Sequence, residues 1–211
     1  MIKTVILDFD GTIGDTCSLI VRTMQQTIAA LDLPGRTDEE CAAMIGLPLR
    51  QTFTDLIPMD EETAFKCEYT YRRLFDENNK PDAVPLFPNV KDTICALYSR
   101  GKTITIASSR GRDTLVDFLK AMGIYDYITY IIAATDIERA KPAPDMVIET
   151  LRNVGGKPEE TIVVGDTRFD IEMGRSAGAR TCGVTYGNGS RESLSDADYI
   201  IDDFGELLNI V

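Results

Sequence analysis

The chain has 211 residues, 44% of them hydrophobic and 27% charged, which is an ordinary composition for a globular protein with a buried core. Its formal net charge is −12 and its pI is about 4.5, so it lacks the excess of basic residues that proteins use to bind nucleic acid. It contains no histidine, which excludes Ser-His catalytic triads and His-ligated metal sites and leaves acid–base chemistry to Asp, Glu, Lys, Tyr or Cys.

The first predicted element is a buried strand over residues 3–8, and it ends in acidic side chains. Asp8 and Asp10 lie on either side of Phe9, and Gly11 allows the chain to turn sharply after them. Two carboxylates at the end of a strand repel each other unless a cation lies between them. Oxygen ligands without His or thiolate favour Mg²⁺ over Zn²⁺. One acid can then act as a nucleophile and the other as a proton shuttle, although a turn with two solvated acids has the same local pattern.

The next segment has helical periodicity and no convincing strand. Apolar spacing and the residues at the expected N-termini predict helices over residues 16–31, 37–45, 49–56 and 60–79. Proline and glycine interrupt the chain between these helices. We therefore expect a small all-helical insertion, over residues 15–81, after the first strand.

The rest of the chain alternates between helices and strands. We expect helices over residues 89–99, 112–122, 145–154, 169–178 and 204–210, and strands over residues 102–107, 127–133, 161–164, 180–184 and 199–201. This alternation predicts an α/β core with a doubly wound, parallel, Rossmann-like sheet, formed by residues 1–14 and 82–211. Such sheets bind ligands at the carboxyl ends of their strands, at the topological switch point.

Polar side chains follow several of the predicted strands at that edge of the sheet. They are Asp8 and Asp10 after the first strand, Ser108, Ser109 and Arg110 after the second, Lys141 in the loop after the third, and Asp166 and Asp170 after the fourth. A magnesium-dependent phosphate site needs acids for the metal, a hydroxyl and backbone N–H groups for phosphate oxygens, and a lysine for developing negative charge. The sequence therefore indicates phosphate chemistry at this edge.

Cysteine use and hydropathy suggest the setting of the protein. The five cysteines are scattered and form no CxxC pair, so neither a disulfide framework nor a zinc site is indicated. Reduced thiols of this kind are typical of the cytoplasm. The apolar run at the N-terminus is too short for a signal peptide, and no stretch reaches the length of a membrane helix. We expect a cytoplasmic protein without nucleic-acid or membrane partners, a monomer by default and a dimer as the alternative.

Four motifs, in this order, resemble those of the haloacid dehalogenase-like hydrolase superfamily. They are Asp8-Phe9-Asp10-Gly11-Thr12, Ser108 after an apolar strand, Lys141-Pro142, and Gly165-Asp166-Thr167-Arg168-Phe169-Asp170. The helical insertion is similar to the small cap of the phosphoglycolate phosphatase-like branch. The resemblance extends from residue 3 to the end of the chain, and it implies a magnesium-dependent phosphatase.

The resemblance also implies a role for each motif residue. Asp8 would be the nucleophile and form an aspartyl phosphate, and Asp10 would be the general acid and base. The phosphoryl oxygens would be bound by the side chains of Ser108 and Lys141, with help from the backbone N–H groups of Phe9 and Ser109. Mg²⁺ would be bound by Asp8, Asp10 through its backbone carbonyl, Asp166 and Asp170, the last of these directly or through water.

Three further residues have roles that the sequence leaves open. Arg110 stands where lysine is frequent in the family, and it would contact the substrate or cap the following helix. Ser109 stands where the close branch usually has asparagine, so the role of its side chain is undecided. Arg50 follows the Gly46-Leu47-Pro48-Leu49 loop, and it would clasp a carboxylate or second phosphate of the substrate, or else lie on the surface of a short helix.

We therefore expect the chain to hydrolyse a small organic phosphate monoester, with phosphoglycolate as the first candidate and Mg²⁺ as the cofactor. The alternatives on the same scaffold are an inorganic pyrophosphatase, a sugar-phosphate phosphatase and a phosphomutase. A binding protein without catalysis is the remaining alternative, and the complete set of acids, with Ser108 and Lys141, argues against it. The expected partner is a small phosphorylated metabolite.

Overall fold

Strand β1 (Thr4–Leu7) is short and entirely buried, and it lies inside a six-stranded sheet of order β3-β2-β1-β4-β5-β6. Every neighbouring pair of strands is parallel. The structure, a computed structural model, describes residues 1–79 and 84–211. The remaining strands are β2 (Thr103–Ser108), β3 (Tyr130–Ala133), β4 (Thr161–Gly165), β5 (Arg180–Val184) and β6 (Tyr199–Ile201). The predicted parallel, doubly wound sheet is therefore confirmed.

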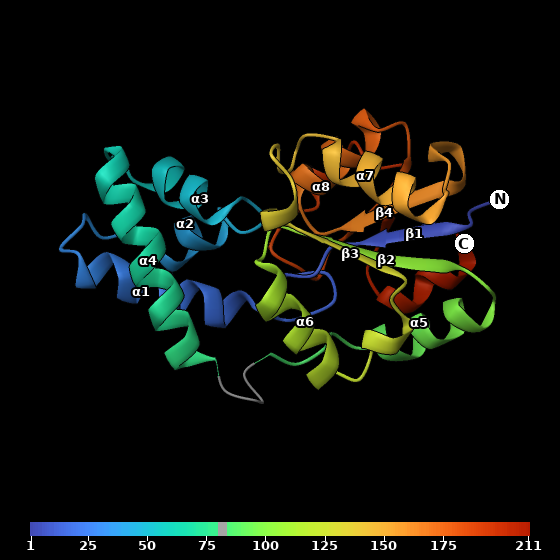
Figure 1. The fold of residues 1–211 in the computed structure, drawn as a ribbon, viewed down its shortest axis with the longest axis horizontal. Helices are drawn as coiled ribbons and strands as arrows, with labels where there is room; N and C mark the ends of the chain where they lie inside the picture. The colour runs from blue at the N-terminus through green and yellow to red at the C-terminus, as the bar shows by residue number, and fades with distance from the viewer. Residues whose placement is uncertain (80–83) are drawn as a thin grey trace.

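Helices cover both faces of this sheet, with α7 and α8 on one face and α5 and α6 on the other (Figure 1). Their bounds are α5 (Val90–Ser99), α6 (Arg112–Ala121), α7 (Asp145–Val154) and α8 (Arg168–Ser176). Because side chains alternate along a strand, Ile6 joins the core beneath α7 and α8, whereas Val5 and Leu7 join the core on the other face. Burial on both faces explains why β1 is a continuous apolar run.

Four helices form an insertion between β1 and α5, on the side of the sheet where its strands end (Figure 1). They are α1 (Cys17–Ala30), α2 (Asp38–Ala42), α3 (Leu49–Leu56) and α4 (Glu61–Asn78). Thr37 and Glu40 form a capping box at the start of α2, and Asp60 Oδ1 accepts a 2.8 Å hydrogen bond from the N–H of Thr63 at the start of α4. Between β1 and α5 the described residues thus form helices and no strand, as the sequence predicts for this segment. The boundary of the insertion with the core, expected between residues 81 and 82, lies outside the described residues.

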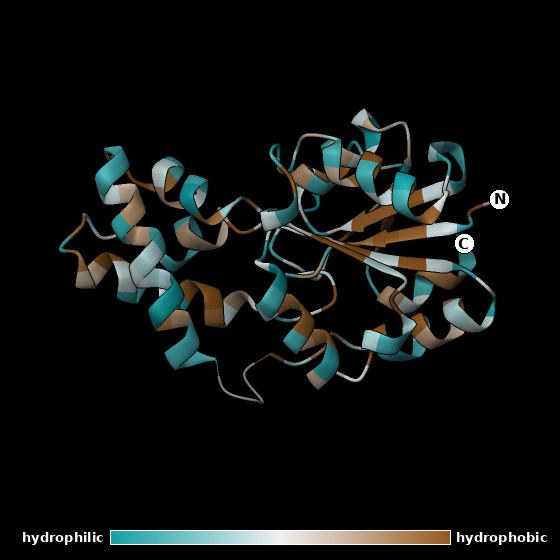
Figure 2. Ribbon diagram, viewed as in Figure 1, coloured by the Kyte–Doolittle hydropathy of each residue, from teal (hydrophilic) through white to brown (hydrophobic). Residues whose placement is uncertain are grey.

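Hydropathy follows this layering (Figure 2). The strands are mostly apolar, and the outward faces of the helices carry the polar residues. Within the described ranges, no helix combines the length and apolar character that crossing a membrane requires.

Three elements differ from their expected form. The helix expected over residues 37–45 is the shorter α2, which ends at Ala42. The strand expected over residues 127–133 begins only at Tyr130, because Tyr125–Tyr127 form the 3₁₀ helix η1. The helix expected over residues 204–210 is a 3₁₀ helix, η5 (Phe204–Asn209). Over so few residues an α-helix and a 3₁₀ helix have nearly the same apolar spacing, so the sequence pattern does not separate them. The other short 3₁₀ segments are η2 (Ala134–Asp136), η3 (Pro158–Glu160) and η4 (Glu192–Leu194).

Candidate active site

The register of the sheet places the ends of β1, β2 and β4 side by side. Leu7, the last residue of β1, pairs with Ile106 of β2 and with Val164 of β4. Asp8 follows directly, and its backbone N–H donates a 2.9 Å hydrogen bond to the carbonyl of Val164. The chain leaves β1 between two strands that come much later in the sequence, which is the topology of a ligand-binding switch point.

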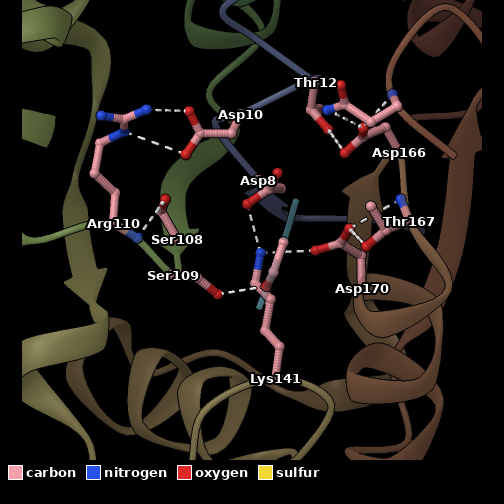
Figure 3. Close-up of polar contacts among 12 residues, drawn as sticks. Asp8, Asp10, Thr12, Ser108, Ser109, Arg110, Lys141, Asp166, Thr167 and Asp170 are labelled. Atoms are coloured by element: carbon pink, nitrogen blue, oxygen red, sulfur yellow. Dashed lines mark hydrogen bonds and ion pairs between the residues drawn. The ribbon is translucent and has the colours of Figure 1, made fainter. Parts of the chain in front are cut away.

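Three of the predicted acids meet at this edge (Figure 3). One carboxylate oxygen from each of Asp8, Asp166 and Asp170 lies within 4.8 Å of the others. These residues are only 5%, 0% and 1% exposed to solvent. Buried negative charges so close together are unfavourable unless a cation or a shared proton offsets them. The cluster is therefore suited to a hard divalent cation.

Lys141 brings a positive charge into this cluster. Its Nζ donates to Oδ1 of Asp8 at 2.5 Å and to Oδ1 of Asp170 at 2.7 Å, and its side chain is buried (Figure 3). The residue lies in the chain segment between β3 and α7. Burial opposes the positive charge, but Asp170 and Asp8 outweigh it and raise the pKa of Lys141 above its ordinary value. Lys141 is therefore a charged bridge between two acids.

Neighbouring polar groups orient the other two acids. Asp166 accepts hydrogen bonds from Thr12 Oγ1 at 3.3 Å and from the backbone N–H and Nδ2 of Asn188 at 2.7 and 3.0 Å. Asp170 accepts from the backbone N–H and the hydroxyl of Thr167 at 3.1 and 2.7 Å, which forms a capping box at the start of α8. Helix capping and a role in the site are thus compatible for Asp170, because its other oxygen faces the ammonium.

The surroundings of two of these acids, Asp8 and Asp166, raise their pKa values. Burial raises the pKa of Asp8 well above its ordinary value, although Lys141 opposes this. Burial and the nearby Asp170 raise the pKa of Asp166 to about 7.

Gly11, with a φ of +85°, lets the backbone pass so closely that a Cβ at this position would lie 2.1 Å from Oδ2 of Asp166. A compact set of oxygen donors with excess negative charge fits Mg²⁺, which would stabilise the ionised carboxylates.

Asp10 has a different partner from the other acids. Both of its carboxylate oxygens accept from Arg110, whose Nε lies 3.2 Å from Oδ2 and whose Nη2 contacts Oδ1 (Figure 3). The side chains of Arg110 and Asp10 are 8% and 13% exposed. The sequence left two possible roles for Arg110, substrate contact or capping of the following helix. Its guanidinium does not cap that helix and is paired with Asp10 instead. The ion pair with Asp10 is a contact that the sequence did not predict.

The two serines at the end of β2 have different contacts. Ser108 is fully buried, and its Oγ accepts a 3.2 Å hydrogen bond from the backbone N–H of Arg110. Ser109 Oγ donates a 2.7 Å hydrogen bond to the carbonyl of Gly46, which lies between α2 and α3. The side chain of Ser109, whose role the sequence left open, therefore joins the edge of the sheet to the insertion.

A cavity of about 1100 Å³ lies between the edge of the sheet and the insertion. Asp8, Asp10 and Arg110 line it from the sheet side, and Arg50 and Phe75 are among the residues that line it from the insertion. A cavity of this size, with a few convergent charged groups on its wall, suits a small molecule. Asp8, the member of the acid cluster that lines the cavity, therefore faces a space in which a substrate can bind.

Comparison with known proteins identifies the family. Residues 5–184 match the family model described as "Haloacid dehalogenase-like hydrolase". The chain belongs to this family. The resemblance that the four motifs indicated is thereby confirmed, and so is the expectation that the protein is a hydrolase.

Relatives of this haloacid dehalogenase-like hydrolase match it along nearly the full length of both chains. Pyrophosphatase PpaX of Anoxybacillus flavithermus is 32% identical over 212 residues, which cover 100% of this chain and 97% of the relative. Phosphoglycolate phosphatase of Salmonella typhimurium is 28% identical, with coverage of 98% and 91%. Among solved structures, one described as a haloacid dehalogenase-like hydrolase from Bacteroides fragilis is 25% identical, with a TM-score of 0.92 and coverage of 98% and 100%.

The hydrolase carries a second charged cluster, formed by Arg50, Glu68 and Arg72, on the insertion side of the cavity. Arg50 donates to Oε2 of Glu68 from Nε at 3.1 Å and from Nη2 at 2.9 Å. Arg72 donates to Oε1 of the same carboxylate at 2.8 Å. The side chains of Arg50 and Arg72 are 48% and 55% exposed, so both can reorient toward a ligand. Arg50 thus lines the cavity. This position is compatible with substrate contact, which is one of the two roles expected for Arg50.

Several contacts in this hydrolase's site were not predicted from the sequence. Thr167 was part of the fourth motif, but its contact with Asp170 was not predicted. Asn188 did carry a signal, because it lies in a loop that follows a strand at the carboxyl edge of the sheet. Glu68 and Arg72 have the i,i+4 spacing of a helical ion pair, but this spacing does not tell which face of the helix borders the cavity. The partner of Arg110 had no local signal, since Asp10 lies 100 positions earlier.

Proposed function

We propose that this hydrolase is a magnesium-dependent phosphatase that cleaves a small organic phosphate monoester through an aspartyl phosphate on Asp8. The observation that carries the proposal is the setting of Asp8. It lies beside the Lys141 ammonium, within the acid cluster, and on the wall of the cavity. A carboxylate nucleophile needs such neighbours, because positive charge offsets the negative charge of the phosphoryl oxygens that it approaches.

In the first step, a carboxylate oxygen of Asp8 attacks phosphorus, and the bond between phosphorus and the ester oxygen breaks. Asp10 donates a proton to that oxygen, so the organic product leaves as an alcohol. During the transfer, the phosphoryl oxygens are held by Lys141, the hydroxyl of Ser108 and the backbone N–H groups of Phe9 and Ser109.

In the second step, water attacks phosphorus and the bond between phosphorus and Asp8 breaks. Asp10, ionised after the first step, accepts a proton from that water. The products are inorganic phosphate, the free carboxylate of Asp8 and a protonated Asp10. Atoms and protons therefore balance over the cycle with water as the only co-reactant.

Mg²⁺ is the proposed cofactor, held by Asp8, Asp166, Asp170 and the backbone carbonyl of Asp10. The chemistry that it supplies is positive charge, which attracts the phosphate and favours the ionised acids. The donor set consists of oxygens alone, and burial together with the nearby Asp170 raises the pKa of Asp166, a setting in which a bound cation would stabilise the ionised carboxylate.

The insertion, over residues 15–81, is proposed to act as a cap on a core of residues 1–14 and 82–211. A cap over the cavity restricts the substrate to a small phosphorylated metabolite and keeps bulk water out. Arg50 and Arg72 border the same cavity, and their guanidinium groups match a second anionic group on the substrate. Phosphoglycolate, which carries a carboxylate besides its phosphate, is the first candidate.

Pyrophosphate is the second candidate, because a relative that is 32% identical along the full chain is named pyrophosphatase PpaX. In this alternative the second phosphate, in place of a carboxylate, would bind near Arg50 and Arg72. The two candidates therefore use the same acid cluster and differ in the group that meets the insertion.

Phosphate release from a panel of compounds tests the proposal. The panel contains phosphoglycolate, pyrophosphate and several sugar phosphates, each assayed with Mg²⁺ and with EDTA. We expect release that depends on Mg²⁺ and favours one compound with a second anionic group. Interconversion of sugar phosphates without release would indicate a phosphomutase instead. No reaction with any compound would overturn the proposed phosphatase and favour a binding protein.

A further inference from the structure

Arg110 holds Asp10 from within a group of aromatic rings. Its guanidinium carbon lies 5.7 Å from the ring centre of Phe9, 5.1 Å from that of Phe118 and 4.9 Å from that of Phe75. Two of its nitrogens each face one oxygen of Asp10 (Figure 3). Arginine keeps its charge at all ordinary pH values and presents its donors in a rigid plane. The arrangement therefore fixes both the plane and the direction of the Asp10 carboxylate.

One of the three rings belongs to the insertion. Phe9 follows β1 and Phe118 belongs to α6, so both are parts of the core, whereas Phe75 belongs to α4. Phe75 is only 4% exposed and stacks on Tyr71 of the same helix with ring centres 5.8 Å apart. Arg110 is thus packed between the two parts of the molecule, and its position depends on where α4 lies.

We propose that Arg110 is a positioning residue for Asp10, and that Phe75 makes this positioning depend on the insertion. The inference rests on the proposed function, in which Asp10 gives a proton in the first step and takes one in the second. A carboxylate whose two oxygens both accept hydrogen bonds from Arg110 carries no proton on either oxygen, which is the form that acts as a base. To act as the acid, one oxygen carries the proton and turns away from the guanidinium. Arg110 therefore supports mainly the second step, the hydrolysis of the aspartyl phosphate.

The substrate p-nitrophenyl phosphate separates the two steps, because nitrophenolate is a stable anion that leaves without a proton. Rapid mixing measures an initial burst of nitrophenolate, which reports the first step, and a later steady rate, which reports the second. For Arg110→Gln we expect the ratio of burst rate to steady rate to rise about 10²-fold over that of the wild type, the range of a lost acid–base contribution. KM should fall together with the steady rate, whereas kcat/KM should stay close to the wild-type value, because kcat/KM reports only binding and the first step and the altered group does not hold the phosphate.

Two further variants test the geometry. Arg110→Lys keeps the positive charge and loses the planar fork, so its ratio should lie between those of Arg110→Gln and the wild type. If Arg110→Gln does not fold, Arg110→Lys takes its place as the test of the positioning role. Phe75→Leu keeps the arginine and removes the aromatic ring that it faces in the insertion, so the ratio should rise by a smaller factor. Arg152→Gln is the matched control, since Arg152 pairs with Glu149 at 3.2 Å and is 73% exposed; it should keep the wild-type ratio.

The other outcomes overturn the inference. A higher KM with an unchanged ratio would make Arg110 a substrate-binding residue. Equal slowing of both steps, together with a lower Tm, would make it a structural residue. If the wild type is active and the Arg110 variants keep its ratio of burst rate to steady rate, the positioning role is overturned but the proposed function is not. A wild type that releases no phosphate from any compound would overturn the proposed function and the inference with it.

Discussion

The Nζ atom of Lys141 lies 2.5 Å from Oδ1 of Asp8, and the two side chains are only 1% and 5% exposed. A buried ion pair gives little net stability, because the cost of removing both charges from water offsets their attraction. Removing one partner is strongly unfavourable, since the other charge is then left buried alone. This pair is therefore better explained by the chemistry of Asp8 than by the stability of the fold.

Replacing Asp8 by Asn should abolish turnover and leave the fold intact. An amide of the same shape is no nucleophile toward phosphorus, so phosphate release from the best substrate should fall by at least about 10³-fold. Lys141 keeps its 2.7 Å pair with Asp170 after this change, and the crowded cluster loses one negative charge, so Tm should not fall. Asp196→Asn, which changes an exposed carboxylate on the surface, is the control. Normal turnover by the Asp8 variant would show that the covalent mechanism is wrong.

Replacing Lys141 by Met should destabilise the protein as well as inactivate it. Asp8 and Asp170 would lose their shared ammonium, and the free energy of unfolding should fall by about 3–5 kcal/mol, as measured by urea unfolding at pH 8. Mg²⁺ should recover part of this loss, because it supplies positive charge to the same acids. Lys66→Met removes an exposed pair with Glu62 and should leave the free energy of unfolding close to the wild-type value. Similar losses in the two variants would contradict the special role of Lys141.

The stabilisation by Mg²⁺ should depend on pH. Burial and Asp170 raise the pKa of Asp166 from 3.8 to about 7, so the folded protein binds this proton more tightly than the unfolded chain does. Without metal, the carboxyl stabilises the fold most below pH 3.8, and this contribution is lost as the pH rises through 7. Mg²⁺ competes with the proton for the carboxylate, so it should raise Tm more at pH 8 than at pH 6.

Calorimetry of the wild type and of Asp166→Asn, with and without Mg²⁺ at both pH values, measures this effect. The Asn variant has no titrating carboxyl at this position, so the difference between the two pH values should shrink. An equal rise in Tm of the wild type at pH 6 and pH 8 would contradict the raised pKa of Asp166.

The arginines of the insertion should select the substrate. Arg50→Ala and Arg72→Ala should each lower kcat/KM for the preferred substrate with two anionic groups by about tenfold, the lower end of what a charged hydrogen bond contributes. The rate with p-nitrophenyl phosphate, which has no second anionic group, should not change. Arg73→Ala is the matched control, because Arg73 lies on the same helix and pairs with Glu77. Equal losses with both substrates would show that the two arginines do not recognise the second group.

The sequence by itself determined the fold and the chemistry present at the edge of the sheet. The helix over residues 145–154 and the strand over residues 180–184 have the expected bounds, and the strands form the expected parallel sheet. This was possible because apolar periodicity and the crossover rule depend on short stretches of chain. Acids that directly follow apolar strands, such as Asp8 and Asp166, are placed at one edge by the sheet itself.

Only the tertiary structure decided which side chains meet across separate elements. Arg110 pairs with Asp10, 100 positions away in the sequence, and its guanidinium packs against Phe75 of α4 and Phe118 of α6. In the same way, the face of α4 that borders the cavity depends on how α4 packs against α1 and α3. Local periodicity tells which residues share a face, but the direction in which that face points follows from burial among distant elements.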